Sequence, residues 1–266
     1  MSASNLTGIS RCFAAIVMLA VIDAGVGTIA AQEQPSGVGP REIWVGADAG
    51  AHNWLVYTGG TYAPWGDIHG SGLRLRSTAG VGRYDFNVTA GGPHTVRRVD
   101  ATKTYGDAMI GYQARFGELT AKAFVGYAGL QTEWRSKDQR RHETVSGLKG
   151  ALELWLNIGS DAWASADLSY ADTRDTASVR VRAGYRVIPT ISVGPELVVN
   201  HAKMYDTVQE QRVNEGRLGL FARYEWFGGE ISGSAGVSAD VGSNLEETDL
   251  LRAAAAYGTI NWIVQF

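Results

Sequence analysis

The sequence predicts an all-β fold: a transmembrane, antiparallel, up-and-down β-barrel of about twelve strands. Three observations lead to this prediction. The last segment alternates apolar and polar residues, the chain holds 34 glycines against six prolines with 10% aromatic residues, and charges recur on one face of the expected strands. Alternation dilutes the hydropathy of each segment, so a membrane protein built from strands lacks the long apolar runs of a spanning helix.

Residues 251–266 give the clearest alternation. One face carries small and apolar side chains through to Phe266, while the other carries mostly polar ones such as Tyr257 and Asn261. The apolar face suits lipid, and we expect this strand to close a barrel by pairing with the first strand. The alternative is the edge strand of a soluble sandwich, although a chain end there would usually fray.

Residues 1–31 have the pattern of a secretory signal peptide. Arg11 precedes an apolar run at residues 12–22, and small residues follow as far as Ala31. The apolar run is short for a transmembrane helix, so a retained anchor is the less favoured alternative. We therefore expect export from the cytoplasm and cleavage near Ala31.

The rest of the chain is long enough for one domain. Residues 32–41 form a Gly-, Pro- and Ser-containing periplasmic leader, and residues 42–266 form the barrel. Cys12 is the only cysteine, so an exported mature chain without disulfides relies on a large core or on a closed hydrogen-bonded barrel. A formal net charge of −3 argues against binding to nucleic acid.

Alternation along the chain predicts the individual strands in order. In residues 73–82, for example, Leu73 and Leu75 point one way and Arg74 and Arg76 the other. The faces of residues 54–62 are both mixed, so their orientation stays open. The expected strands are residues 43–49, 54–62, 73–82, 107–115, 121–127, 148–157, 164–170, 177–187, 191–199, 218–226, 231–239 and 251–266.

Connections between the expected strands alternate between tight turns and longer polar loops. The long loops are expected at residues 87–103, 134–143 and 204–215. With both chain ends in the periplasm, the tight turns lie on the periplasmic side and the long loops outside the cell. A soluble sandwich gives no reason for this sorting.

Most charges within the expected strands share the inward face. A charge at the lipid midplane costs about 2–4 kcal/mol, so their common orientation itself favours a barrel. They could form a salt-bridged plug, or they could line a polar conduit for a small or extended solute; a catalytic role is a third, less favoured option. The inward charges are Asp48, Arg74, Arg76, Asp107, Lys122, Lys149, Glu153, Asp167, Arg180, Arg182, Glu196 and Arg223.

Aromatic residues lie on both faces. The inward ones either pack against arginine stems or offer ring faces for stacking on sugars. Outward tyrosines and tryptophans fit the interfacial girdles of a membrane barrel. The inward set is Trp44, Phe124, Trp155, Trp163 and Phe221. The candidate residues for contact with a glucan or solute in the lumen are Arg74, Arg76, Trp155, Arg180 and Arg182.

The sequence offers little support for an enzyme. The histidines His52, His94, His142 and His201 fall in or beside the expected outer loops, but their spacing matches no HExxH pattern. A GxSxG elbow and a P-loop are also missing from the sequence. We therefore expect no catalytic residue, no metal and no cofactor. An outer-membrane lipid-modifying enzyme or protease would need these histidines within hydrogen-bond reach of a carboxylate or serine.

The order of several segments resembles the cellulose biosynthesis protein BcsS family of alphaproteobacteria. The resemblance covers roughly residues 44–240, and its motifs are structural, with no recognised active site to carry over. The segments that carry it are WVGADAG with the following YTGG, GLRLRSTAGVGRYDF, GDAMIGYQ, VSGLKGALELW and VRVRAGYRVIPTISVGPELVV.

The resemblance implies an outer-membrane-type barrel associated with bacterial cellulose production. On this basis we expect a non-enzymatic protein of the Gram-negative outer membrane that is accessory to cellulose (β-glucan) biosynthesis or export. Its expected partners are outer-membrane lipid, the β-glucan polymer and cellulose secretion components. The alternative function is a small general porin or an anion-preferring channel.

Overall fold

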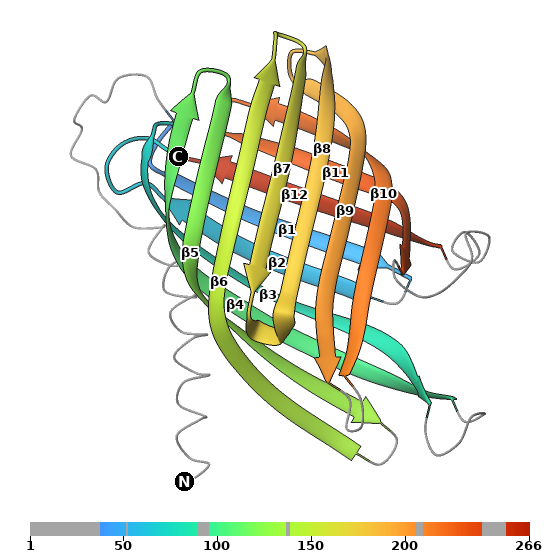
Figure 1. The fold of residues 1–266 in the computed structure, drawn as a ribbon. Coiled ribbons are helices and arrows are strands. Elements are labelled where there is room, and N and C mark those ends of the chain that lie inside the picture. Colours follow the sequence, from blue (N-terminus) through green and yellow to red (C-terminus); the bar gives the residue numbers. More distant parts are fainter. Residues whose placement is uncertain (1–37, 52, 90–95, 137–138, 206–209, 241–253) are drawn as a thin grey trace.

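The computed structural model describes residues 38–51, 53–89, 96–136, 139–205, 210–240 and 254–266. Within them, twelve antiparallel strands each pair with the next, and β12 pairs with β1 to close the barrel (Figure 1), as predicted. The strands are β1 (Arg41–Gly50), β2 (Asn53–Tyr62), β3 (Gly72–Thr89), β4 (Val96–Phe116), β5 (Leu119–Ser136), β6 (Gln139–Ile158), β7 (Ala162–Ala171), β8 (Thr176–Ile188), β9 (Ile191–Tyr205), β10 (Glu210–Trp226), β11 (Gly229–Asp240) and β12 (Ala255–Gln265).

The predicted signal peptide, residues 1–31, and the leader up to residue 37 lie outside the described residues, as do His52 and His94. The proposed division of the chain into signal, leader and barrel therefore stays a prediction. Among the described residues, no helix has the length and apolar character needed to cross a membrane.

The last strand closes the barrel as expected. β12 runs antiparallel to β1 with Val45 opposite Trp262, and the backbone of Phe266 exchanges two hydrogen bonds with Arg41 at 2.9 and 3.0 Å. Because β12 also pairs with β11, neither end of the sheet leaves an open edge at this seam.

The outer surface of the barrel is apolar. Large hydrophobic side chains alternate with inward polar ones and stay exposed, as suits a surface that faces lipid. Exposed apolar residues include Val45, Val56, Leu75, Ile110, Val125, Leu152, Val181, Leu197, Leu220, Ile231 and Ile260. All residues predicted for the aromatic girdles are exposed, namely Tyr112, Tyr127, Tyr170, Tyr185, Tyr224, Trp226 and Trp262.

Inside the barrel, large rings lie over glycines of the neighbouring strand. Trp163 of β7 stands opposite Gly184 of β8, and a Cβ atom added to Gly184 would meet the Trp163 ring. Trp44 covers Gly59 of the adjacent strand in the same way. The same arrangement pairs Tyr57 with Gly46, Tyr105 with Gly80 and Phe124 with Gly111. The glycine content therefore makes room for rings that fill the lumen.

The two ends of the barrel differ. The end where the chain enters β1 and leaves β12 carries the turns at residues 117–118, 159–161, 189–190 and 227–228; we call it the short-turn end. It also carries the longer connection between β2 and β3, residues 63–71. The opposite end, which we call the long-loop end, is the one predicted to lie outside the cell.

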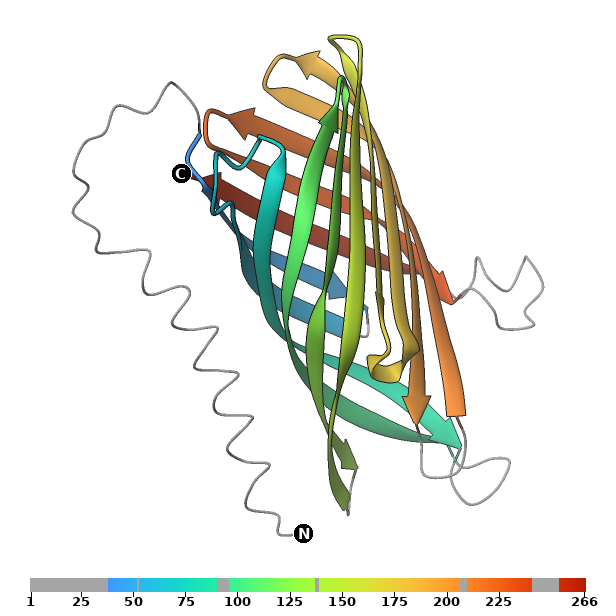
Figure 2. The same cartoon turned by 60° about the vertical axis from the view of Figure 1, so that its left-hand side comes forward.

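Three predicted loops are wrong in extent. Residues 87–103, 134–143 and 204–215 consist mostly of strand, because β3 to β6, β9 and β10 continue well beyond the shorter β1 and β2 (Figure 2). A strand above the membrane can be polar on both faces while its backbone ladder continues. Apolar alternation therefore ends at the membrane surface, whereas the strand does not.

Candidate functional site: a charged and aromatic lumen

The lumen is crossed by contacts between strands that are far apart in the barrel. Arg76 of β3 pairs with Glu153 of β6, and Arg217 of β10 pairs with Asp48 of β1 at 2.5 Å. Each contact skips two intervening strands, so it spans the interior and does not follow the wall. The inward orientation predicted for Arg76, Glu153 and Asp48 is thereby confirmed.

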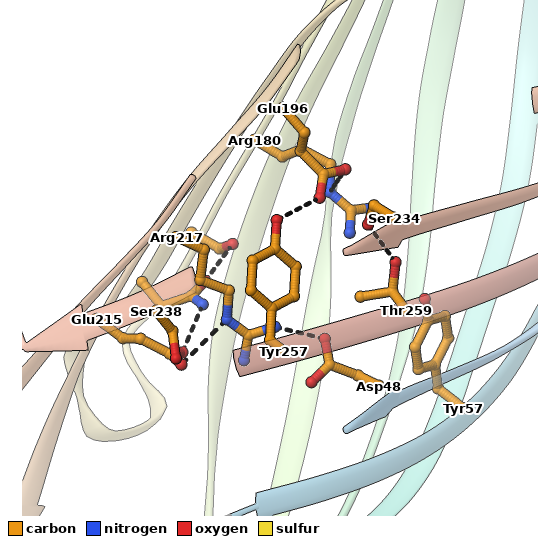
Figure 3. A network of polar contacts seen from close by, with 12 residues as sticks. Asp48, Tyr57, Arg180, Glu196, Glu215, Arg217, Ser234, Ser238, Tyr257 and Thr259 are labelled. Atoms are coloured by element: carbon orange, nitrogen blue, oxygen red, sulfur yellow. Dashed lines mark hydrogen bonds and ion pairs between the residues drawn. The ribbon is translucent and has the colours of Figure 1, made fainter. Parts of the chain in front are cut away.

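One network inside the barrel joins Arg217 to Tyr257 and Glu196 (Figure 3). The Arg217 guanidinium lies 5.2 Å from the centre of the Tyr257 ring, and the Tyr257 hydroxyl donates to Glu196 Oε1 at 3.2 Å. Arg180 Nε lies 3.4 Å from the other oxygen of Glu196, whose side chain is 2% exposed. A carboxylate this buried is tolerated because a base and a hydroxyl both contact it.

A second cluster stacks aromatic rings with guanidinium groups towards the short-turn end. Trp155 and Trp163 are stacked with ring centres 4.2 Å apart, and Phe221 follows 5.2 Å from Trp163. Arg223 lies 4.6 Å above the Trp155 ring, while Arg182 lies 5.6 Å from Phe221. Trp163 is 1% exposed, so its ring face is covered by the protein itself.

A third cluster surrounds Arg76. Its guanidinium lies 5.0 Å from the Trp44 ring and 5.2 Å from the Phe124 ring, in addition to its ion pair with Glu153. Lys122 approaches the other oxygen of Glu153 at 3.6 Å. Cation–π contacts and ion pairs thus hold this side chain across the lumen.

The five candidate residues do not form a single site. Arg76, Trp155, Arg180 and Arg182 reach the lumen, but they belong to the three clusters just described. Whether any of them contacts a ligand stays a prediction.

Arg74 has a different position from the other candidates. It is 1% exposed, and its two terminal nitrogens donate to the carbonyl oxygens of Leu73, Asp67, Ile68 and Gly70. Its donors therefore hold the connection at residues 63–71 against the short-turn end.

Besides Arg74, two of the predicted inward charges have no ion pair in the described part of the chain. Asp167 stands opposite Glu153 on β6 and Arg180 on β8, yet no oppositely charged nitrogen lies within 4.0 Å of it. Arg182 likewise has no carboxylate within that distance, and its Nε is buried without a hydrogen-bond partner among the described residues. Water would satisfy these groups in a wet lumen.

The sequence reasoning missed Arg217, Glu215 and Tyr57 as lumen residues. Arg217 falls between the loop expected at residues 204–215 and the strand expected at residues 218–226. Its odd residue number nevertheless gives it the same inward face as Phe221 and Arg223. Tyr57 lies on β2, whose orientation the mixed pattern left open, and its hydroxyl donates to Asn261 across β1. Extending the parity of β10 would have identified Arg217; no sequence signal could have identified Tyr57.

At the long-loop end, a short 3-10 helix, η1 (Thr173–Asp175), joins β7 to β8 and bridges two taller hairpins. Arg174 pairs with Glu143 of β6 and lies 4.9 Å from the Trp134 ring, and Lys203 of β9 pairs with Asp175 at 2.9 Å. The hydrogen bond from Tyr170 holds the pKa of Asp175 below its usual range. Arg174 and Asp175 both have positive φ angles, 57° and 49°.

Of the three described histidines, His69 lies on the connection at residues 63–71 and the other two lie in strands. His142 and His201 lie within the paired strands β6 and β9, not in loops. His142 Nδ1 lies 3.8 Å from Glu133, and His201 Nδ1 lies 2.5 Å from Asn214 Oδ1. Among the described residues, no group of three or more His, Cys, Asp or Glu side chains is placed to hold a metal ion.

A closed antiparallel barrel with an apolar exterior and a lumen packed with ion pairs and rings is a β-barrel of the outer-membrane type. The family model for cellulose biosynthesis protein BcsS matches residues 43–266, so the chain belongs to this family. No curated protein matches the chain.

Several solved structures share the barrel fold at low sequence identity. The translocator domain of the autotransporter NalP from Neisseria meningitidis is 13% identical with a TM-score of 0.47, covering 99% of this chain and 98% of that chain. The transport unit of AIDA-I from Escherichia coli is 14% identical with a TM-score of 0.48 and coverage of 96% and 98%. The KdgM porin is 8% identical with a TM-score of 0.42 and coverage of 85% and 99%.

Proposed function

We propose that this protein is a non-enzymatic outer-membrane barrel, accessory to the synthesis or export of cellulose, whose lumen is filled by its own side chains. Membership of the BcsS family supports the link to cellulose, and the apolar exterior supports insertion in a membrane. The expected partners are outer-membrane lipid, the β-glucan and components of the cellulose secretion apparatus.

The observation that carries the proposal is the set of contacts across the lumen. Arg76 with Glu153, Arg217 with Asp48, and Arg223 over Trp155 join strands three or four positions apart. They lie at different heights, so a glucan chain would have to break more than one set to pass. An accessory role fits this geometry better than a permanently open conduit.

An anion-preferring channel is less well supported. Such a channel needs bases whose charge is not cancelled, but most inward bases have a carboxylate partner. Lys149, for example, lies 2.5 Å from Asp107, and Arg217 contacts both Asp48 and Glu215. Among the candidate residues, Arg74 and Arg182 have no such partner in the described part of the chain, and Arg74 is bound by carbonyl oxygens.

A non-enzymatic role is supported by the placement of the described histidines. His142 and His201 lie on β6 and β9, and each contacts only exposed or amide-bearing neighbours. Neither stands beside a buried serine or carboxylate in the arrangement that a hydrolase uses.

The test is cellulose output, measured by dye binding and by enzymatic release of glucose, from a strain with a clean in-frame deletion. We expect the deletion to lower extracellular cellulose and the wild-type gene to restore it. Unchanged cellulose in the deletion strain would contradict the proposal.

Complementation with Arg180→Ala/Arg182→Ala tests whether side chains of the lumen contribute to cellulose output. The matched control is Arg83→Ala/Arg135→Ala, which removes two arginines from exposed positions. If the lumen variant reaches the outer membrane but fails to restore cellulose while the control succeeds, the lumen acts in export or assembly. If both restore it, the function resides on the surfaces of the barrel.

A further inference from the structure

A partly open cavity of about 250 Å³ lies at the short-turn end of the barrel, where Trp226 and Phe227 form part of its rim. Its wall includes the inward residues Arg223 and Glu225 of β10, Glu230 of β11 and Gln265 of β12, and His69 of the connection at residues 63–71 also lines it. None of these residues belonged to the predicted lumen site. Arg223 alone was predicted to be an inward charge. Arg74 holds the connection that carries His69.

Arg223 is rigidly held in this cavity. Its side chain is 10% exposed, its Nε donates to Glu230 at 2.7 Å, and its Nη2 contacts both Glu230 and Glu225. On its other side the guanidinium lies 4.6 Å from the Trp155 ring and 5.2 Å from the Trp163 ring. Its Nη1 is buried and has no hydrogen-bond partner among the described residues.

The charges in the cavity restrict what it could bind. Arg223 supplies one positive charge against the two negative charges of Glu225 and Glu230, so an anionic ligand would meet net repulsion. A metal ion would have to compete with a guanidinium already bound by both carboxylates. A neutral ligand with hydroxyl groups meets neither penalty.

The polar groups suit a sugar. The two carboxylates accept hydrogen bonds from hydroxyls, and the amide oxygen of Gln265 can accept one as well, while its nitrogen donates to Glu42 at 2.7 Å. Pockets for drug-sized ligands measure about 300–1,000 Å³. A smaller cavity of this kind therefore fits one sugar ring and not a longer segment.

From this geometry we propose that the cavity binds a single hexose unit of a β-glucan at the short-turn end, which is expected to face the periplasm. The choice of a β-glucan rests on the proposed function, whereas the preference for a neutral hydroxylated ring rests on the cavity itself. Binding here would hold a chain end beneath the aromatic cluster without requiring passage through the lumen.

The test is calorimetric titration of the purified full-length mature barrel in detergent with cellohexaose, and with a hexamer of galacturonic acid as an anionic probe of the same ring size. We expect cellohexaose to bind and the anionic hexamer to bind at least tenfold more weakly, because its carboxylates meet the net negative charge of the cavity. Glu225→Gln/Glu230→Gln should weaken cellohexaose binding at least tenfold. Glu215→Gln is the matched control, because Glu215 is a lumen carboxylate paired with Arg217 away from the cavity.

His69→Ala provides a second variant that leaves the barrel wall intact, since His69 is exposed on the connection. It should weaken binding several-fold while the folded barrel remains resistant to detergent. No binding by the wild type, equal binding of the anionic hexamer, or equal losses in Glu215→Gln and the cavity variants would overturn the inference. Cellohexaose binding in a protein whose deletion leaves cellulose unchanged would refute the proposed function and leave the sugar site standing.

Discussion

At the scale of single residues, the lumen depends on rings that rest on glycines. A Cβ atom at Gly184 would press into the Trp163 ring, which is 1% exposed and cannot move aside freely. We expect Gly184→Ala to lower the free energy of unfolding by about 1–3 kcal/mol, the usual cost of overpacking. Urea unfolding of the folded barrel, followed by tryptophan fluorescence, measures it.

Gly129→Ala is the control for this substitution, because nothing lies within 4 Å of a Cβ atom at that strand position. It should leave stability unchanged or raise it by roughly 0.5–1 kcal/mol, since glycine weakens a strand. Equal effects of the two substitutions would show that the rings do not depend on their glycines. The sequence could predict that Trp163 points inward, but not its glycine partner, because register is set by pairing that one strand cannot reveal.

Arg74 is the second residue with a specific prediction. Its guanidinium donates to carbonyls of Asp67, Ile68 and Gly70. Arg74→Ala leaves the carbonyl of Ile68 unpaired and removes one of two donors from each of the other two, which costs about 1–3 kcal/mol locally. We expect a chymotrypsin-like protease to cut after Trp65, which is 76% exposed, at least tenfold faster in the variant. The barrel itself should stay folded.

Arg74→Lys keeps the charge but loses the planar fork of donors, so it should restore little of the protection. Arg83→Ala serves as the control, because the Arg83 to Asp100 pair is about half exposed and contributes at most about 1 kcal/mol. If Arg74→Ala is cut no faster than Arg83→Ala, the connection is held by other contacts, such as the hydrogen bond from Ile68 to Gly39.

At the scale of elements, β5 serves two environments along its length. Its first half faces lipid, with Val125 58% exposed, and its second half continues above the membrane paired with β6. We expect a barrel in which residues 134–141 are replaced by Asn-Gly, a two-residue hairpin turn, to assemble. It should lose about 0.5–1 kcal/mol, because the cation–π contact between Arg174 and Trp134 is removed. Assembly is read from the mobility shift between heated and unheated samples on a gel.

Val125→Arg changes the same strand at the level of the lipid midplane, where a charge costs about 2–4 kcal/mol. It should impair assembly although only one residue changes. A shortened hairpin that fails to assemble would mean that the extension of β5 and β6 is part of the stability of the barrel. The sequence predicted the lipid-facing half of this element from alternation, and it missed the outer half because both faces there are polar.

At the scale of the whole molecule, strand number, closure and the division into apolar exterior and charged interior could all be predicted, because each follows from a period of two residues repeated along the chain. The division of the lumen into three clusters could not. Arg76 and its partner Glu153 are 77 residues apart, and only the closed topology brings them together. Arg74 shows the same limit, since its parity predicts an inward position but not the connection that it holds.

The filled lumen makes a prediction about ion flow through the complete barrel. Wild-type protein in planar lipid bilayers should show no stable conductance steps, because the pairs Arg76–Glu153 and Arg217–Asp48 cross the interior at separate positions. Replacing all four residues by alanine removes both partners of each pair, and of their neighbours it leaves Lys122 without Glu153 and Glu215 without Arg217. This variant should conduct in steps.

The control for the conductance measurement is Arg83→Ala/Asp100→Ala, which removes an ion pair of exposed side chains. It should remain as silent as the wild type, because neither residue contributes to the contacts across the lumen. Stable steps from the wild type would contradict a filled lumen and favour the channel. If none of the three proteins conducts, the barrier to ions lies at the stacked rings of Trp155 and Trp163. The fourfold replacement leaves this contact in place.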